Sequence, residues 1–82
     1  MSAQIEDTAA LGRMVRRVRT GMRLTQPDLA MTAGVGLRFI VELEKGKPTA
    51  QLGKVMLVLR TLGIAVALTP PPGLEMDDGA NA

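Results

Sequence analysis

The sequence has no cysteine, no histidine, no tryptophan and no tyrosine, and only one phenylalanine among its 82 residues. Without cysteine the chain forms neither a disulfide nor a thiolate metal site, and without histidine it lacks the commonest general base. Its carboxylates form no cluster with metal-ligand spacing, and no Gly-rich phosphate loop follows a strand. We therefore expect that the protein is not an enzyme and that it uses no cofactor and no metal.

Long apolar runs are also missing. An apolar stretch such as Val55–Leu59 is far shorter than the ~20 residues that a membrane span requires. The first seven residues contain neither a basic segment nor an apolar segment, so they do not have the pattern of an export signal. These absences predict a soluble, cytoplasmic protein that does not associate with a membrane.

The charges are distributed unevenly. The net charge is +2, but residues 1–69 hold all 10 basic residues and only 5 of the 8 acidic ones, a net charge of +5. Residues 70–82 are rich in proline, glycine and acids. We predict a flexible N-terminus over residues 1–7, a basic domain over residues 8–69 that suits a polyanionic partner, and a disordered acidic tail over residues 70–82.

Apolar residues recur at helical spacing in four segments. The first predicted helix has Thr8 as its N-cap and ends at Gly21. The second helix, over residues 26–32, starts in a capping box formed by Thr25 and Asp28.

A tight turn at Gly34 separates the second helix from a third over residues 36–45, and Thr49 caps a fourth helix that Gly63 ends. The core side chains expected from the last two helices are Phe39, Ile40, Leu43, Leu52, Val55, Met56, Leu59 and Leu62. Gap-filling positions in the core are expected for Met14, Met31 and Met56.

Large and small apolar residues alternate over residues 64–69, and three prolines follow, which predicts one strand. A lone strand leaves its backbone N–H and C=O groups without a ladder, and a second copy of the chain is the simplest source of one. A core this small also seldom supplies more than ~3–5 kcal/mol without a staple or a partner. We therefore expect a homodimer, and its predicted dimerisation residues are Ile64, Ala65, Val66, Ala67 and Leu68.

Two helices joined by a glycine turn are the arrangement in which one helix enters the DNA major groove while the other crosses the backbone. The sequence resembles the Cro/C1-type (XRE) helix-turn-helix family over residues 11–47. The residues that carry the resemblance are the run Gln26–Gly36 and Ile40, Leu43, Glu44 and Gly46. The resemblance implies an all-α fold: a four-helix, lambda-repressor-like domain, here with a short C-terminal β-strand that pairs across the homodimer.

Three later segments, 44–49, 52–55 and 62–64, look like the HipB-like branch of that family. Members of this branch are antitoxins that pair with HipA-type serine/threonine kinase toxins and dimerise partly through a C-terminal strand. The resemblance thus implies a nucleoid-associated repressor that binds double-stranded DNA at an inverted-repeat operator. It also implies that the protein regulates its own operon and sequesters a HipA-like kinase.

The family pattern assigns DNA contacts to individual residues. Gln26, at the N-terminus of the second helix, would contact a phosphate. On the exposed side of the third helix, Leu37 would touch a thymine methyl, Arg38 would bind a guanine, and Glu42 would accept from a cytosine amine. For each of these residues the alternative is an ordinary surface side chain.

Two positions depart from the family pattern but stay assigned to the DNA interface. Gly36 stands where Ser or Thr is common, so a side-chain cap on the third helix is lost. Val41 stands where Ser is frequent, and with Leu37 it makes the reading surface more apolar than usual. The basic residues expected to reach phosphates are Arg23, Lys45 and Lys47.

Glu44 lies on the same side of the third helix as its apolar residues. The family pairs it with the arginine seven positions before Gln26, which in this chain is Arg19. The resemblance therefore implies a partly buried Arg19–Glu44 salt bridge with a structural role.

Two other functions stay open. One is a stand-alone, phage-type XRE repressor without a toxin. The other is a module that mainly holds a partner protein and binds DNA weakly, which the apolar Leu37 and Val41 favour.

Overall fold

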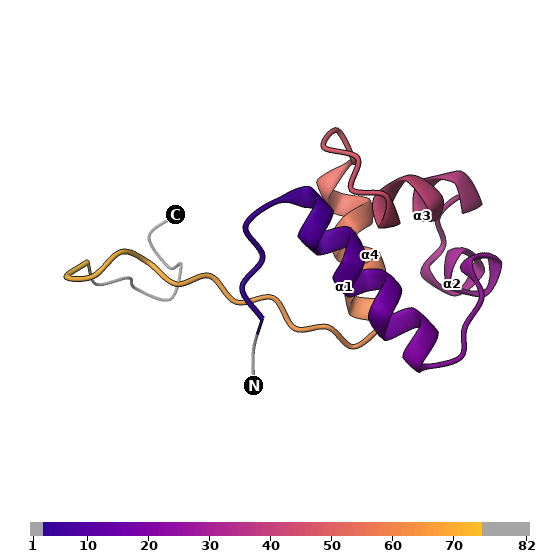
Figure 1. Cartoon of the computed structure of the whole chain (residues 1–82), viewed down its shortest axis with the longest axis horizontal. Helices are drawn as coiled ribbons and strands as arrows, with labels where there is room; N and C mark the ends of the chain where they lie inside the picture. The colour runs from indigo at the N-terminus through magenta and orange to yellow at the C-terminus, as the bar shows by residue number, and fades with distance from the viewer. Residues whose placement is uncertain (1–2, 75–82) are drawn as a thin grey trace.

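The structure, a computed structural model, describes residues 3–74, and over that range it contains four helices (Figure 1). They are α1 (Thr8–Gly21), α2 (Gln26–Ala33), α3 (Leu37–Glu44) and α4 (Leu52–Thr61). The predicted four-helix, all-α architecture is confirmed. None of the four is both long and apolar enough for a membrane crossing. The parts of the predicted flexible N-terminus and acidic tail at residues 1–2 and 75–82 lie outside the described residues.

The N-terminus of α1 is capped one residue earlier than predicted. Asp7, not Thr8, is the N-cap, and its carboxylate accepts a hydrogen bond from the backbone N–H of Ala10 at 2.7 Å. A carboxylate also suits the positive end of the helix dipole. The Thr8 hydroxyl instead donates to the backbone carbonyl of Gly46 at 2.7 Å, which joins α1 to the loop after α3.

The capping box predicted for α2 is confirmed. Thr25 Oγ1 accepts from the backbone N–H of Asp28, and the Asp28 carboxylate accepts from the backbone N–H of Thr25, each at 3.1 Å. The hydrogen bond from the Thr25 backbone lowers the pKa of Asp28, because it favours the ionised carboxylate. At the other end of α2, Gly34 has a φ of 75°, which glycine adopts without strain and which turns the chain into α3.

Other helix boundaries also differ from the prediction, and α3 ends at Glu44 rather than at residue 45. α2 continues one residue further, to Ala33, and α3 begins after Gly36, which is its N-cap. α4 begins at Leu52 with Gln51, not Thr49, as its N-cap, and the Gln51 side chain makes no capping hydrogen bond. Apolar spacing does not define such ends, because the terminal residues of a helix contribute little to its buried face.

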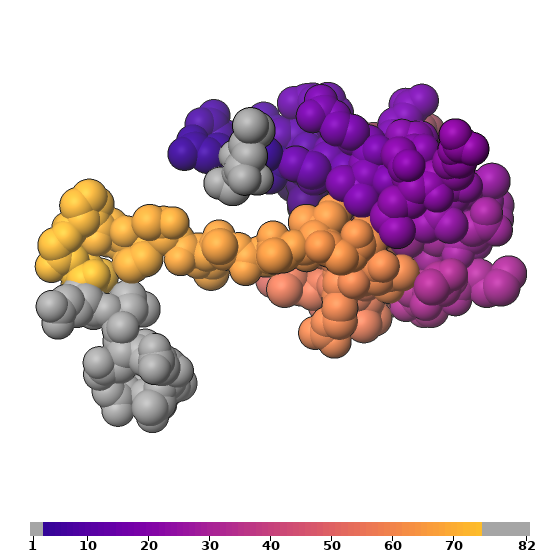
Figure 2. All heavy atoms as spheres, turned by 90° about the horizontal axis from the view of Figure 1, so that it is seen from below, coloured from indigo at the N-terminus to yellow at the C-terminus, as the bar shows by residue number. Residues whose placement is uncertain are grey.

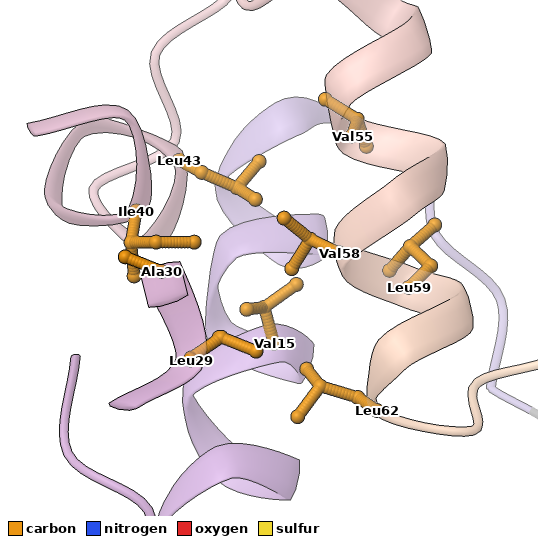
Figure 3. Close-up of a cluster of buried hydrophobic side chains, with 9 residues drawn as sticks. All are labelled: Val15, Leu29, Ala30, Ile40, Leu43, Val55, Val58, Leu59 and Leu62. Atoms are coloured by element: carbon orange, nitrogen blue, oxygen red, sulfur yellow. The ribbon is translucent and has the colours of Figure 1, made fainter. Parts of the chain in front are cut away.

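The core is formed jointly by the four helices (Figure 3). Val15, Leu29, Ile40 and Val58 are fully buried, and each comes from a different helix. The half-buried Phe39 packs against this cluster. The other buried apolar residues are Ala30, Leu43, Val55, Leu59 and Leu62. α4 supplies one stripe of the core because residues 55, 58, 59 and 62 fall on one helical face.

Some predicted core positions are wrong. Leu52 is 72% exposed and Met56 is 40% exposed, and the core position in this part of α4 belongs to Val58, which the prediction missed. Leu52 lies in the first turn of α4, and Met56 lies about 100° round the helix from the buried Val55. Met31 is 81% exposed, so it does not fill a gap in the core either.

After α4 the chain leaves the helical body as an extended segment (Figures 1 and 2). Ile64 still packs against the core, whereas residues 65–69 are exposed. The strand predicted for residues 64–69 is absent from the described part of the chain, residues 3–74. The physical reason is that a strand needs a ladder partner, and the single chain does not supply one.

α1 packs tightly against the end of α3 at Gly12. A Cβ atom at this position would lie 2.5 Å from the carbonyl oxygen of Leu43 and 2.6 Å from that of Glu44. Optimal contacts between such atoms are about 3.5–4.0 Å, and backbone atoms do not swing aside as a flexible side chain does. Space, rather than φ, therefore requires glycine here.

We predict that Gly12→Ala lowers the free energy of unfolding by about 1–3 kcal/mol, the usual range for an overpacked position. Gly21→Ala is the control, because Gly21 lies in the same helix and a Cβ there meets nothing within 4 Å. Its stability should stay constant or rise by up to ~1 kcal/mol. Urea unfolding followed by circular dichroism measures both, and equal stabilities would contradict the close approach of α1 to α3.

Candidate nucleic-acid interface

α3 has one buried side and one accessible side. Ile40 and Leu43 point into the core. The side chains predicted to read bases are exposed or half-buried and share the opposite side, here named the recognition face: Leu37, Arg38, Val41 and Glu42. The fold thus brings these four residues together on a single helical surface that is open to a ligand.

The N-terminus of α3 has no side-chain cap. Gly36 is the N-cap residue, and no side chain accepts a hydrogen bond from the first turn. A Cβ atom at Gly36 would meet nothing within 4 Å, so space does not require glycine. The structure agrees with the loss of a cap that the sequence indicates.

A buried ion pair joins α1 to α3. Arg19 is 9% exposed, and its Nε and Nη2 donate to Oε2 and Oε1 of Glu44 at 2.6 and 3.0 Å. Its Nη1 donates to the backbone carbonyl of Leu24 at 2.8 Å. The hydrogen bond to Glu44 raises the pKa of Arg19 and outweighs the opposing effect of burial. The structure therefore contains the salt bridge that the family resemblance implies.

The same carboxylate holds Gln26. The Nε2 of Gln26 donates to Oε1 of Glu44 at 3.1 Å, which ties the first residue of α2 to the last residue of α3. A carboxylate only accepts, so the amide nitrogen faces Glu44 and its second N–H is left for another acceptor. Sequence reasoning missed this contact, because the two residues lie on different helices and no periodicity links them.

Glu42 is bound through both of its carboxylate oxygens. Arg38, one turn earlier, donates through Nε to Oε1 at 3.2 Å, and Lys47 Nζ lies 2.5 Å from Oε2. The hydrogen bond to Lys47 is the main reason why the pKa of Glu42 lies below its ordinary value. The Arg38–Glu42 pair can be predicted from the sequence, because the two residues are spaced i,i+4 on a helix. The Lys47–Glu42 pair cannot, because it depends on the course of the loop after α3.

Further basic residues lie at the C-terminal end of α3, in the turn before α2 and in α4. Lys45 is exposed at its C-terminal end, and Arg23 lies in the turn before α2 with a φ of 61°. Lys54, a basic residue that is not among the predicted phosphate contacts, lies with its Nζ 5.8 Å from the ring centroid of Phe39. Lys47 and Lys54 both line an open hollow of about 370 Å³ between α3 and the start of α4. Positive charge therefore flanks the recognition face.

The residues predicted for dimerisation leave apolar side chains at the surface. Val66 is 51% exposed and Leu68 is 92% exposed. Met56, Ile64 and Val66 line a second hollow, of about 210 Å³, beside the end of α4. α4 and the extended segment thus share a surface that a single chain leaves partly uncovered.

No protein-family model matches the sequence. Among curated proteins, the chain is 54% identical over 71 residues to a protein of Sinorhizobium fredii (strain NBRC 101917 / NGR234) named as the HTH-type transcriptional regulator y4mF. The match covers 87% of this chain and 93% of that protein. The relative is named as a regulator of transcription, which agrees with the expectation that the chain is not an enzyme.

Solved structures share the fold. A chain of a HipB-O4 20mer complex matches with a TM-score of 0.77 and 22% identity, over 84% of this chain and 97% of that chain. A chain of a HipA-HipB-O2-O3 complex gives the same TM-score, identity and coverage. At such identities the likeness supports the fold alone.

We predict that Glu44→Ala lowers the melting temperature strongly, because it leaves the buried guanidinium of Arg19 without its partner. Breaking a buried pair in this way typically costs about 3–5 kcal/mol. Glu42→Ala is the matched control on the same helix, and its effect should be much smaller because its partners Arg38 and Lys47 are exposed. Thermal melting followed by circular dichroism measures both, and an unchanged melting temperature for Glu44→Ala would rule out a structural role for the pair.

Proposed function

This chain belongs to the HTH-type transcriptional regulators, and on that premise we propose that it represses transcription by binding an inverted-repeat DNA operator as a homodimer. Residues 8–69 would form the unit that binds DNA and dimerises. The observation that carries the proposal is the accessible recognition face of α3, flanked by positive charge. In this arrangement α3 enters the major groove while α2 crosses the backbone.

Contacts to the phosphate backbone of the DNA would position the protein on the duplex. Gln26 donates its second amide N–H to a phosphate at the N-terminus of α2, where the helix dipole favours an anion. Lys45, Lys47 and Arg23 bind phosphates on either side of the groove. Each neutralised phosphate contributes about −0.9 to the slope of log affinity against log salt, so binding should be strongly salt-dependent.

Base edges would be read by the recognition face. Arg38 donates to guanine, Glu42 accepts from a cytosine amine, and Leu37 and Val41 contact thymine methyl groups or the apolar parts of the groove. Gly36 lets the backbone approach the DNA closely at the start of α3, because no side chain stands in the way.

The dimer would form through the extended segment after α4. Ile64, Ala65, Val66, Ala67 and Leu68 would pair as a strand with the same residues of a second copy across a two-fold axis. The exposure of Val66 and Leu68 in the single chain supports this, because a partner strand would cover them and supply the missing ladder. The two α3 helices would then address half-sites about one helical turn, or a multiple, apart.

We further propose that the chain is the antitoxin of a HipBA-type operon, which regulates that operon and holds a HipA-like serine/threonine kinase. The shared fold with a chain of the HipA-HipB-O2-O3 complex supports this. The protein would act in the cytoplasm, at the nucleoid. A stand-alone repressor is the second candidate, and a neighbouring reading frame that encodes a kinase would separate the two.

A module that mainly holds a partner protein is the third candidate. The apolar side chains of Leu37 and Val41 on the recognition face favour it. It predicts weak, salt-insensitive binding to any duplex, which separates it from a repressor.

The proposed function is tested by measuring the binding of the full chain to DNA from its own upstream region and to an unrelated duplex, at two salt concentrations, by fluorescence anisotropy. We expect tight, salt-sensitive binding that prefers the upstream DNA. Arg38→Ala should reduce that preference by about 5-fold or more, because a bidentate base contact contributes roughly 1–3 kcal/mol of discrimination. Equal weak binding to both duplexes would instead favour the partner-holding module.

Ending the chain after Gly63 tests the dimer separately. The truncated protein keeps all four helices but loses the predicted strand, so we expect a monomer at micromolar concentration and weaker operator binding. Analytical ultracentrifugation of the truncated and full chains measures the change. A truncated protein that stays dimeric at that concentration would contradict dimerisation through residues 64–69.

A further inference from the structure

We propose that Glu42 is a specificity-determining residue. In the free protein its carboxylate engages two cationic side chains, Arg38 and Lys47, that would face the DNA. It thereby weakens binding to every duplex that offers no base amine opposite it. This inference rests on the proposed DNA binding through α3. It goes beyond a base contact by Glu42, because it couples three residues that would otherwise act independently.

The geometry carries the coupling. Arg38 Nε lies 3.2 Å from one oxygen of Glu42, and Lys47 Nζ lies 2.5 Å from the other. The side chain of Glu42 is 31% exposed, against 92% for Arg38 and 47% for Lys47. The carboxylate is therefore the most enclosed of the three groups, in the hollow between α3 and α4. The two cations lie nearer to solvent, on the side from which DNA would approach.

A phosphate that approaches Lys47 therefore meets an ion pair rather than an unpaired ammonium. The three charges sum to +1, whereas Arg38 and Lys47 alone would present +2. A phosphate gains less from such a pair, because the Glu42 carboxylate repels it at close range. The attraction to any DNA, regardless of its sequence, is reduced accordingly.

A base amine changes this balance. The N4 amine of cytosine donates to a carboxylate, so it can replace one of the two cations on Glu42. The displaced cation then becomes available to a phosphate or to a guanine. Where the duplex instead presents an acceptor opposite Glu42, such as guanine O6 or thymine O4, the carboxylate cannot hydrogen-bond to that oxygen and is repelled by its partial negative charge, so the cations stay paired. Glu42 thus weakens binding to unrelated DNA more than binding to a matched site.

The test uses the full chain with Glu42→Gln, which removes the charge at nearly constant shape. Glu6→Gln is the control, because Glu6 is exposed in the segment before α1 and carries the same charge change. For Glu42→Gln we expect affinity for an unrelated duplex to rise about 5-fold, the upper range for surface ion pairs. Affinity for upstream DNA should rise less or fall. Glu6→Gln should change both affinities equally.

A double-mutant cycle on the unrelated duplex tests the coupling directly. Lys47→Met should weaken binding by less than about 2-fold while Glu42 is present, and by about 5-fold in the Glu42→Gln background, where Lys47 is no longer held. Equal effects of Lys47→Met in the two backgrounds would overturn the proposal. The proposal would also be overturned if Glu42→Gln raised the affinity for both duplexes by the same factor as Glu6→Gln does. That result would mark a general effect of net charge.

The outcomes separate this proposal from the proposed function. A wild-type protein that binds both duplexes equally would reject both sequence-specific repression and a specificity-determining role of Glu42. Specific binding of the wild type without coupling in the cycle would overturn the proposal for Glu42 alone. Absence of binding to either duplex would overturn both. Melting curves of each variant confirm that the affinities compare folded proteins.

Discussion

The buried ion pair between Arg19 and Glu44 is the contact on which the placement of α3 depends. It links α1 to the end of α3, it reaches the turn before α2 through the carbonyl of Leu24, and it holds Gln26 at the start of α2. A buried pair adds little net stability compared with apolar residues of the same size, but breaking it is costly. The pair therefore favours one placement of α3 against α1, because a displaced helix would leave a buried charge unpaired, and the hydrogen bond from Gln26 ties α2 to the same carboxylate.

Two acids two residues apart on α3 have different roles because of where the helix places them. Successive residues are about 100° apart, so Glu42 and Glu44 lie about 200° apart round the axis. Glu44 is enclosed and paired with Arg19, whereas Glu42 is partly exposed and its partners Arg38 and Lys47 are exposed to solvent. A single turn of helix thus carries one carboxylate that fixes the fold and one that we propose governs which duplexes are bound.

The sequence predicts the features that depend on neighbouring residues. The capping box of Thr25 and Asp28, the turn at Gly34 and the burial of Ile40 all follow from local spacing and backbone preference. The Arg19–Glu44 pair came from family resemblance, not from periodicity.

What the sequence does not predict depends on how distant elements pack. The contact of Gln26 with Glu44 and that of Lys47 with Glu42 join different segments. The exposure of Leu52 follows from its place in the first turn of α4, and that of Met56 from the side of the helix on which it lies. A strand over residues 64–69 would need a ladder partner, so its absence from a single chain follows from how strands are held together.

The contribution of α4 to the core has a consequence for synthesis of the protein. Val15, Leu29 and Ile40 lie before residue 50, but they are covered by Val58 and its neighbours Leu59 and Leu62. A domain folds as a unit once its core residues are present. A nascent chain in which α2 and α3 are complete, but α4 is still inside the ribosome, therefore lacks part of the core against which α3 and its recognition face are packed.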